Sequence, residues 1–70
     1  METHDFRDGA GPVPAARHVN PTGDLGGWVA ATAYVHPRTG LDPDAEIVGT
    51  ARVMVDHFDG RMDSGIVVSG

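Results

Sequence analysis

Carboxylate side chains gather in the second half of the chain, in a pattern that suits the binding of a basic partner. Between positions 41 and 63 there are six of them: Asp42, Asp44, Glu46, Asp56, Asp59 and Asp63. Only Arg52 and Arg61 offset their charge within that stretch. Interfaces of this kind gain association rate and specificity from charge, and affinity from buried anchors. We therefore expect the six carboxylates to form an acidic ridge that binds a partner, unless they are simply a solvated face.

The aromatic side chains near this ridge are the candidate anchors. Tyr34 and Phe58 are the two that we predict to be partner-binding, and Trp28 and Met54 are further candidates. Aromatic residues and methionine are enriched at the centres of protein interfaces. Trp28 has the alternative role of a core residue that closes one end of the domain.

Other reactive groups do not assemble into a catalytic or metal-binding pattern. The segment from Asp56 to Asp63 has oxygen ligands around Gly60, but it lacks the alternating spacing and terminal Glu of a calcium loop. The glycines between Gly23 and Gly27 are followed by no lysine and open no helix, so tight turns explain them better than phosphate binding. The four histidines show no partner pattern. We expect a protein that is not an enzyme and holds no cofactor or metal.

Composition narrows the class of partner. The chain has 70 residues, a formal net charge of −5, five arginines, no lysine and no cysteine. An acidic chain without a basic cluster binds phosphate backbones poorly, so direct contact with nucleic acid is not expected. A domain this small buries only about 60% of its unfolded surface and, without disulfides, is best supported by association. A homo-oligomer, either a dimer or a trimer, is therefore predicted.

Hydropathy points away from membranes. The sequence contains no apolar run near the 18 residues that a membrane span requires. Its N-terminus lacks the basic start and apolar core of a signal peptide. These features predict a soluble, cytoplasmic protein without membrane contact.

The elements that must position the carboxylates follow a six-residue period. Aliphatic residues recur at Val29, Val35, Leu41, Ile47 and Val53. For each of the first four, the residue found four positions later in the chain is small. Three short strands joined by tight corners would make one coil of about eighteen residues, with one aliphatic side chain per side filling the interior.

This period also predicts a register. Residues eighteen apart should stack, which places Ile47 on Val29 and Val53 on Val35 inside, and Arg52 on Tyr34 outside. The repeat fails at position 59, so we expect an inserted loop near 56–65 within a repeat domain spanning 19–70. Residues 1–18 are predicted to be an extended or flexible N-terminal arm. Two prolines in this arm argue against a central strand there.

The opening of the repeat resembles a known group. The segment from Gly23 to Val29, read as Gly-Asp-Leu-Gly-Gly-Trp-Val, resembles the start of small hexapeptide-repeat proteins of phages and prophages. That resemblance implies the handedness of the coil. It gives the fold class as all-β, a minimal left-handed parallel β-helix of about two to three coils with an extended N-terminal arm.

The same resemblance suggests a role. Combined with small size and acidity, it favours a non-catalytic interaction protein, such as a phage-borne, anti-CRISPR-like inhibitor that occupies a basic, nucleic-acid-binding surface of a host defence complex. One alternative is a structural or capping element of a virion or scaffold. Another is a remnant of the hexapeptide acyltransferases, although this chain has fewer coils and no acceptor-site loop.

Overall fold

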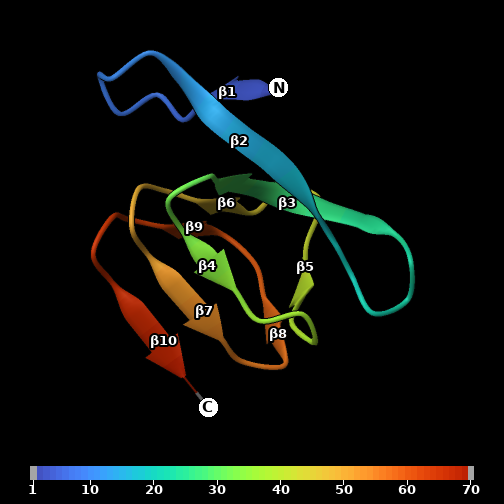
Figure 1. Ribbon diagram of the computed structural model, residues 1–70. Helices are drawn as coiled ribbons and strands as arrows, with labels where there is room; N and C mark the ends of the chain where they lie inside the picture. The colour runs from blue at the N-terminus through green and yellow to red at the C-terminus, as the bar shows by residue number, and fades with distance from the viewer. Residues whose placement is uncertain (1, 70) are drawn as a thin grey trace.

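The computed structural model describes residues 2–69, which form ten short strands and no helix (Figure 1). In chain order they are β1 (Thr3–Asp5), β2 (Pro12–Val19), β3 (Leu25–Ala30), β4 (Tyr34–Val35), β5 (Gly40–Leu41), β6 (Glu46–Ile47), β7 (Arg52–Met54), β8 (His57–Phe58), β9 (Arg61–Met62) and β10 (Val67–Ser69). Turns with Gly, Pro or Asp separate most of them, which keeps the strands short.

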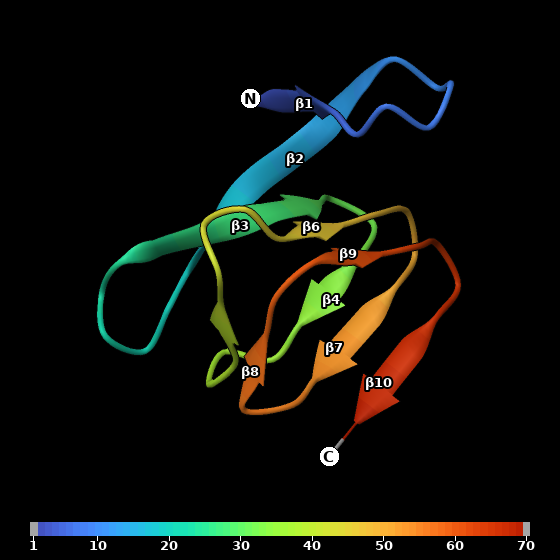
Figure 2. The same cartoon turned by 180° about the vertical axis from the view of Figure 1, so that it is seen from behind.

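The strands pair into three sheets. The largest has the order β1-β2-β3-β6-β9, the second has the order β10-β7-β4, and the third contains β5 and β8. The pairs β1–β2 and β2–β3 are antiparallel, whereas the ladders β3–β6–β9, β4–β7–β10 and β5–β8 are parallel. Figure 2 shows β2 crossing above β3 at one end of the molecule, with β10 at the other end.

The prediction of a minimal left-handed parallel β-helix is wrong. The largest sheet is mixed, three separate sheets are present among residues 2–69, and none of them closes into a solenoid. The cause is the turn at 20–24, where Asn20 N donates to Asp24 O (2.8 Å) and Gly23 takes a positive φ of 91°. This turn reverses the chain and adds β2 antiparallel to β3. The all-β class is retained.

The predicted register is confirmed for the first parallel contacts. Val29 pairs with Ile47 and Val35 pairs with Val53, each eighteen positions apart. The next contacts are shorter, because Ile47 pairs with Met62 at fifteen positions. The segment 56–65 therefore does not form the expected inserted loop. It contains β8 and β9, and the turn of the repeat between Ile47 and Met62 is three residues shorter than the predicted eighteen.

The five aliphatic positions of the repeat build the main core, as predicted. Leu41, Ile47 and Val53 are at most 1% exposed, and Val29 and Val35 pack against them while half-buried. The small residues of the period are also enclosed at Thr39, Ala45 and Ala51. Burial of aliphatic side chains is the dominant favourable term in a fold of this size.

The N-terminal segment differs most from the expectation of an extended or flexible arm. β1 and β2 form a hairpin, and β2 is a central strand between β1 and β3. Phe6 is 1% exposed and packs in a second core with Ala15, Ala30 and Val48. Pro14 is tolerated because its carbonyl accepts from Ala31 N at 2.9 Å, a bond that requires no proline N–H.

Candidate partner-binding surface

Three of the six predicted carboxylates come together on two stacked turns. The turn between β5 and β6 carries Asp42 and Asp44, and the turn between β8 and β9 carries Asp59. Asp42 N donates to Phe58 O at 3.1 Å, which fixes one turn against the other. Asp44 and Asp59 are exposed and Asp42 is half-buried. We call Asp42, Asp44 and Asp59 the acidic corner.

The acidic corner is held by its own backbone and is not neutralised. Asp44 N donates to the Asp42 carboxylate (3.3 Å), and Ala45 N donates to the Asp42 carbonyl (2.9 Å). The ion pairs formed within residues 2–69 involve other carboxylates. Three negative charges therefore sit on turns tied by backbone hydrogen bonds, with Asp44 and Asp59 exposed and Asp42 half-buried.

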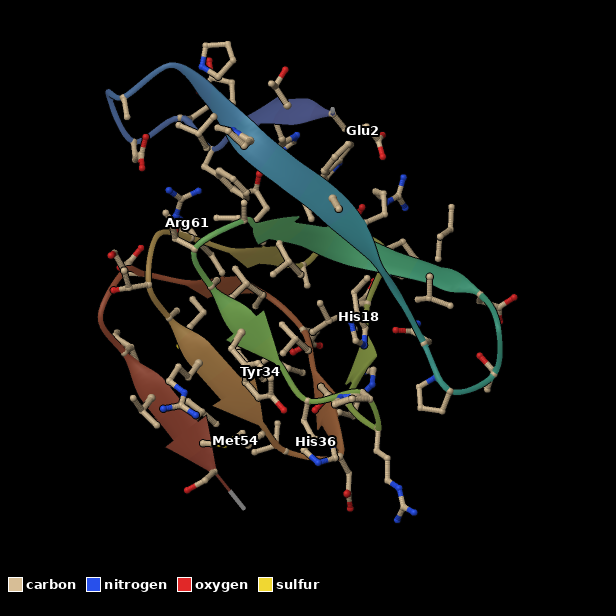
Figure 3. The ribbon with its side chains drawn as sticks, in the orientation of Figure 1. Glu2, His18, Tyr34, His36, Met54 and Arg61 are labelled. Atoms are coloured by element: carbon tan, nitrogen blue, oxygen red, sulfur yellow. The ribbon has the colours of Figure 1, made fainter. Side chains whose placement is uncertain are left out.

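Glu46 is placed elsewhere and serves the fold. Its carboxylate contacts His4 Nε2 at 2.8 Å, Arg61 Nη1 at 3.1 Å and Arg7 Nη2 at 3.5 Å, and its side chain is 13% exposed. Burial by itself raises the pKa of Glu46, but the hydrogen bond from His4 and the charges of Arg7 and Arg61 outweigh it, so the pKa lies below its ordinary value. Arg61 Nη1 also donates to Phe6 O at 2.6 Å. This network fastens the N-terminal hairpin to β6 and β9, and Figure 3 labels Arg61, which lies beside the hairpin loop.

The remaining two carboxylates lie at two further corners. Asp63 follows β9 and contacts Arg61 Nε at 3.4 Å. Asp56 follows β7, and its carbonyl accepts from Gly40 N at 2.9 Å. Because the six side chains are divided among three corners and an internal network, they do not form the single ridge that the sequence suggested.

The predicted anchors also differ in their surroundings. Tyr34 is 42% exposed on the outer face of β4, and the Arg52 guanidinium lies 5.5 Å from its ring centre, which is the predicted contact. Phe58 is half-buried against the main core. Trp28 is half-buried, and His4 stacks on its ring with centroids 4.6 Å apart, so its role is structural.

The structure also contains an apolar groove that the sequence does not predict. This groove has a volume of about 490 Å³ and lies between β2 and the first turn of the repeat, which begins with β3 and β4. It is lined by Glu2, by residues 14–19 of β2, and by Val29, Ala30, Ala31 and Val35. No sequence signal could have located it, because it depends on β2 crossing over the open end of the repeat. We call this feature the groove.

Other classes of site receive no support from the residues described. Within 2–69, no group of three or more His, Asp or Glu side chains is arranged to hold a metal ion. The same residues include no helix of a length and apolarity that would cross a membrane. Comparison with protein-family models, with curated proteins and with solved structures gave no match to this chain.

Proposed function

We propose that the chain is a non-catalytic protein-interaction module whose acidic corner binds a basic surface of another protein. The observation that carries the proposal is the grouping of Asp42, Asp44 and Asp59 on two stacked turns, outside the ion pairs of residues 2–69. A surface that keeps several like charges available is suited to steer a partner of opposite charge.

Rigidity adds to the case. Both turns are tied to neighbouring strands, since Asp42 N donates to Phe58 O and Glu46 N donates to Gly60 O at 3.0 Å. Carboxylates that are already in place lose little conformational freedom on binding, so more of the interaction energy is available for affinity.

The partner class that fits best is a protein with a nucleic-acid-binding groove, because such grooves concentrate Arg and Lys. The resemblance of residues 23–29 to phage and prophage proteins favours a phage-borne inhibitor of a host defence complex, acting in the bacterial cytoplasm. On this proposal the chain contacts neither nucleic acid nor membrane itself.

A structural role is the second candidate, and strand edges favour it. β8, β9 and β10 each stand last in their ladders, so one end of the molecule presents three edges. Exposed edges promote pairing with another chain. A capping or scaffold element should form large defined assemblies alone, whereas an inhibitor should remain a monomer or a small homo-oligomer, and light scattering distinguishes these outcomes.

The acidic corner is tested by removing its charge. A triple Asp→Asn variant of the corner should lose partner capture from a bacterial lysate, with the association rate reduced on the order of tenfold at low salt. The difference in association rate between the variant and the parent chain should become smaller at high salt, because exposed charges are then screened. The matched control removes the same charge at exposed positions elsewhere: Asp5→Asn, Asp8→Asn and Asp24→Asn.

The control variant should capture the partner as the parent chain does. A captured protein should also release bound DNA when the parent chain is added. The proposal fails if no partner is captured in stoichiometric amounts at low or moderate salt, or if the two triple variants behave alike.

A further inference from the structure

β4 presents one edge to the groove. Tyr34 N donates to Ala51 O at 3.0 Å, and His36 N donates to Val53 O at 2.9 Å, so both of these groups face β7. Successive backbone groups along a strand point to opposite sides. The N–H and C=O of Val35 therefore point away from β7, and β4 is the edge strand of its sheet on that side.

The chain covers the corresponding edges of the two neighbouring strands with its own groups. β2 pairs along β3. Beside β5, the Asn20 amide takes the place of a neighbouring backbone, because Leu41 N donates to Asn20 Oδ1 (2.9 Å) and Asn20 Nδ2 donates to Leu41 O (3.0 Å). His18 Nε2 donates to Thr39 O at 2.7 Å. The edge of β4 lies between these two covered edges.

The interior is also incomplete at this end. Val29 and Val35 are half-buried, whereas Ile47 and Val53, directly beneath them, are 0% exposed. Ala16 pairs with Val29, so its small side chain lies on the same face of the sheet and is exposed above the groove. The groove has room for a further aliphatic side chain in the same column.

We propose that the groove binds an extended segment of a partner protein, which pairs with β4 and places one aliphatic side chain over Val35. Strand addition of this type takes affinity from backbone hydrogen bonds and specificity from pockets for alternate side chains. Glu2 is exposed and lines the groove, and Figure 3 shows it near the hairpin, with His18 lower in the same region. Arg17 also lines the groove, but its Nε donates to Gly26 O at 2.8 Å, so the charge of Glu2 and the net charge of −5 favour a segment that carries Lys or Arg.

This site is separate from the acidic corner, so the two proposals can fail independently. The probe is an acetylated and amidated peptide, Lys-Thr-Val-Thr-Lys, titrated into the ¹⁵N-labelled full chain. A peptide with Ser in place of the central Val keeps the charge and removes the aliphatic group. Binding should be weak, on the order of 1 mM for so short a segment. The largest shift changes should occur at the amides of Val35, Ala31 and Ala16.

One substitution fills the groove without disturbing the fold. Ala16→Leu places a larger side chain over Val29, so the variant should be at least as heat-stable as the parent and should bind the peptide about tenfold more weakly. Ala10→Leu is the matched control, because Ala10 is exposed on the hairpin loop outside the groove. It should leave the affinity unchanged.

The pair of peptides and the Ala16→Leu variant test the contact of the aliphatic side chain with the groove in two separate ways. Equal affinity for the Val and Ser peptides, or full binding by a folded Ala16→Leu variant, would overturn the proposal. The triple Asp→Asn variant of the acidic corner should bind the peptide like the parent. If that variant loses the peptide while Ala16→Leu keeps it, the lysines bind the acidic corner and the groove is not the site.

Discussion

Phe6→Ala tests whether the N-terminal hairpin belongs to the cooperative fold. Phe6 lies in the loop after β1, far in sequence from Val48, yet it packs against that residue and is 1% exposed. A flexible arm would leave such a side chain in water. The structure instead makes it the largest member of the second core, so its removal should be felt by the whole domain.

The magnitude follows from its burial. Truncation of a buried Phe to Ala costs about 3–5 kcal/mol, from lost transfer energy and the cavity that remains. Folded domains have about 0.05–0.15 kcal/mol of stability per residue, or about 4–10 kcal/mol for a chain of this length. Phe6→Ala should therefore remove about half of the free energy of unfolding, and all of it at the low end of that range.

Urea denaturation followed by tryptophan fluorescence measures this loss. Trp28 is the only tryptophan and stacks on His4 of the hairpin, so it reports on both parts of the molecule. With a slope of about 1 kcal/mol per molar urea, the midpoint should fall by about 3 M or more. Val19→Ala is the control, because Val19 is 59% exposed and should shift the midpoint little. If Phe6→Ala moved the midpoint no further than this control, the hairpin would be an independent arm and the reasoning would be refuted.

Two further predictions concern the contacts around β6. A Cβ at Gly27 would lie 2.1 Å from Ala45 O, so Gly27→Ala should destabilise by about 3 kcal/mol in urea melts, whereas Gly40→Ala, with its nearest atom at 3.5 Å, should be tolerated. Glu46→Gln should cost about 1–3 kcal/mol near neutral pH, because the charged partners of the carboxylate lose it. Since the folded pKa of Glu46 lies below its ordinary value of 4.5, its contribution is complete above that value and is lost as the pH falls through the lowered pKa. Melts from pH 7 to pH 2 should therefore show the parent losing its advantage over Glu46→Gln below about pH 4.5, and parallel curves would contradict the stabilising role of the His4, Arg7 and Arg61 contacts.

The interior was predictable because aliphatic residues recur at a short, fixed spacing along the chain. One aliphatic residue in every six positions reports the side-chain period of three short strands, and this reading required no knowledge of distant contacts. It placed Ile47 and Val53 at the centre and matched them correctly with Val29 and Val35. The contact of Arg52 with Tyr34 followed from the same register.

The arrangement of the sheets was not predictable in this way, because the hairpin has no period. Phe6 is a single apolar residue among polar neighbours, and the prolines of β2 argue against a central strand. Their missing N–H groups are tolerated only because Val13 pairs with His4 and the Pro14 carbonyl accepts from Ala31. Tertiary contacts of this kind override the local preference of proline against central strands, and no local sequence pattern indicates them.

The candidate site was only partly predictable for a related reason. The carboxylates are visible in the sequence, but their grouping depends on the registers of β8 and β9, which are shorter than eighteen residues. A strict eighteen-residue register would place residue 64 beside Glu46, whereas the observed register places Arg61 there. That shift gives Glu46 a cationic partner and removes it from the partner-binding set. The β5–β8 ladder is shorter than eighteen by one residue, since Leu41 pairs with Phe58, and this brings Asp59 next to Asp42.

The glycine-rich opening at 23–27 explains why the repeat stops where it does. The turn explanation holds at Gly23, which has positive φ, but it is wrong for the other two positions. A Cβ at Gly26 would lie 2.7 Å from both Asn20 Oδ1 and Leu41 O, so only glycine lets the Asn20 amide reach the edge of β5. Gly27 allows the same close approach to Ala45 O. The motif therefore brings one capping side chain and one antiparallel strand onto two of the three edges, and it is this arrangement that leaves the β4 edge at the bottom of the groove.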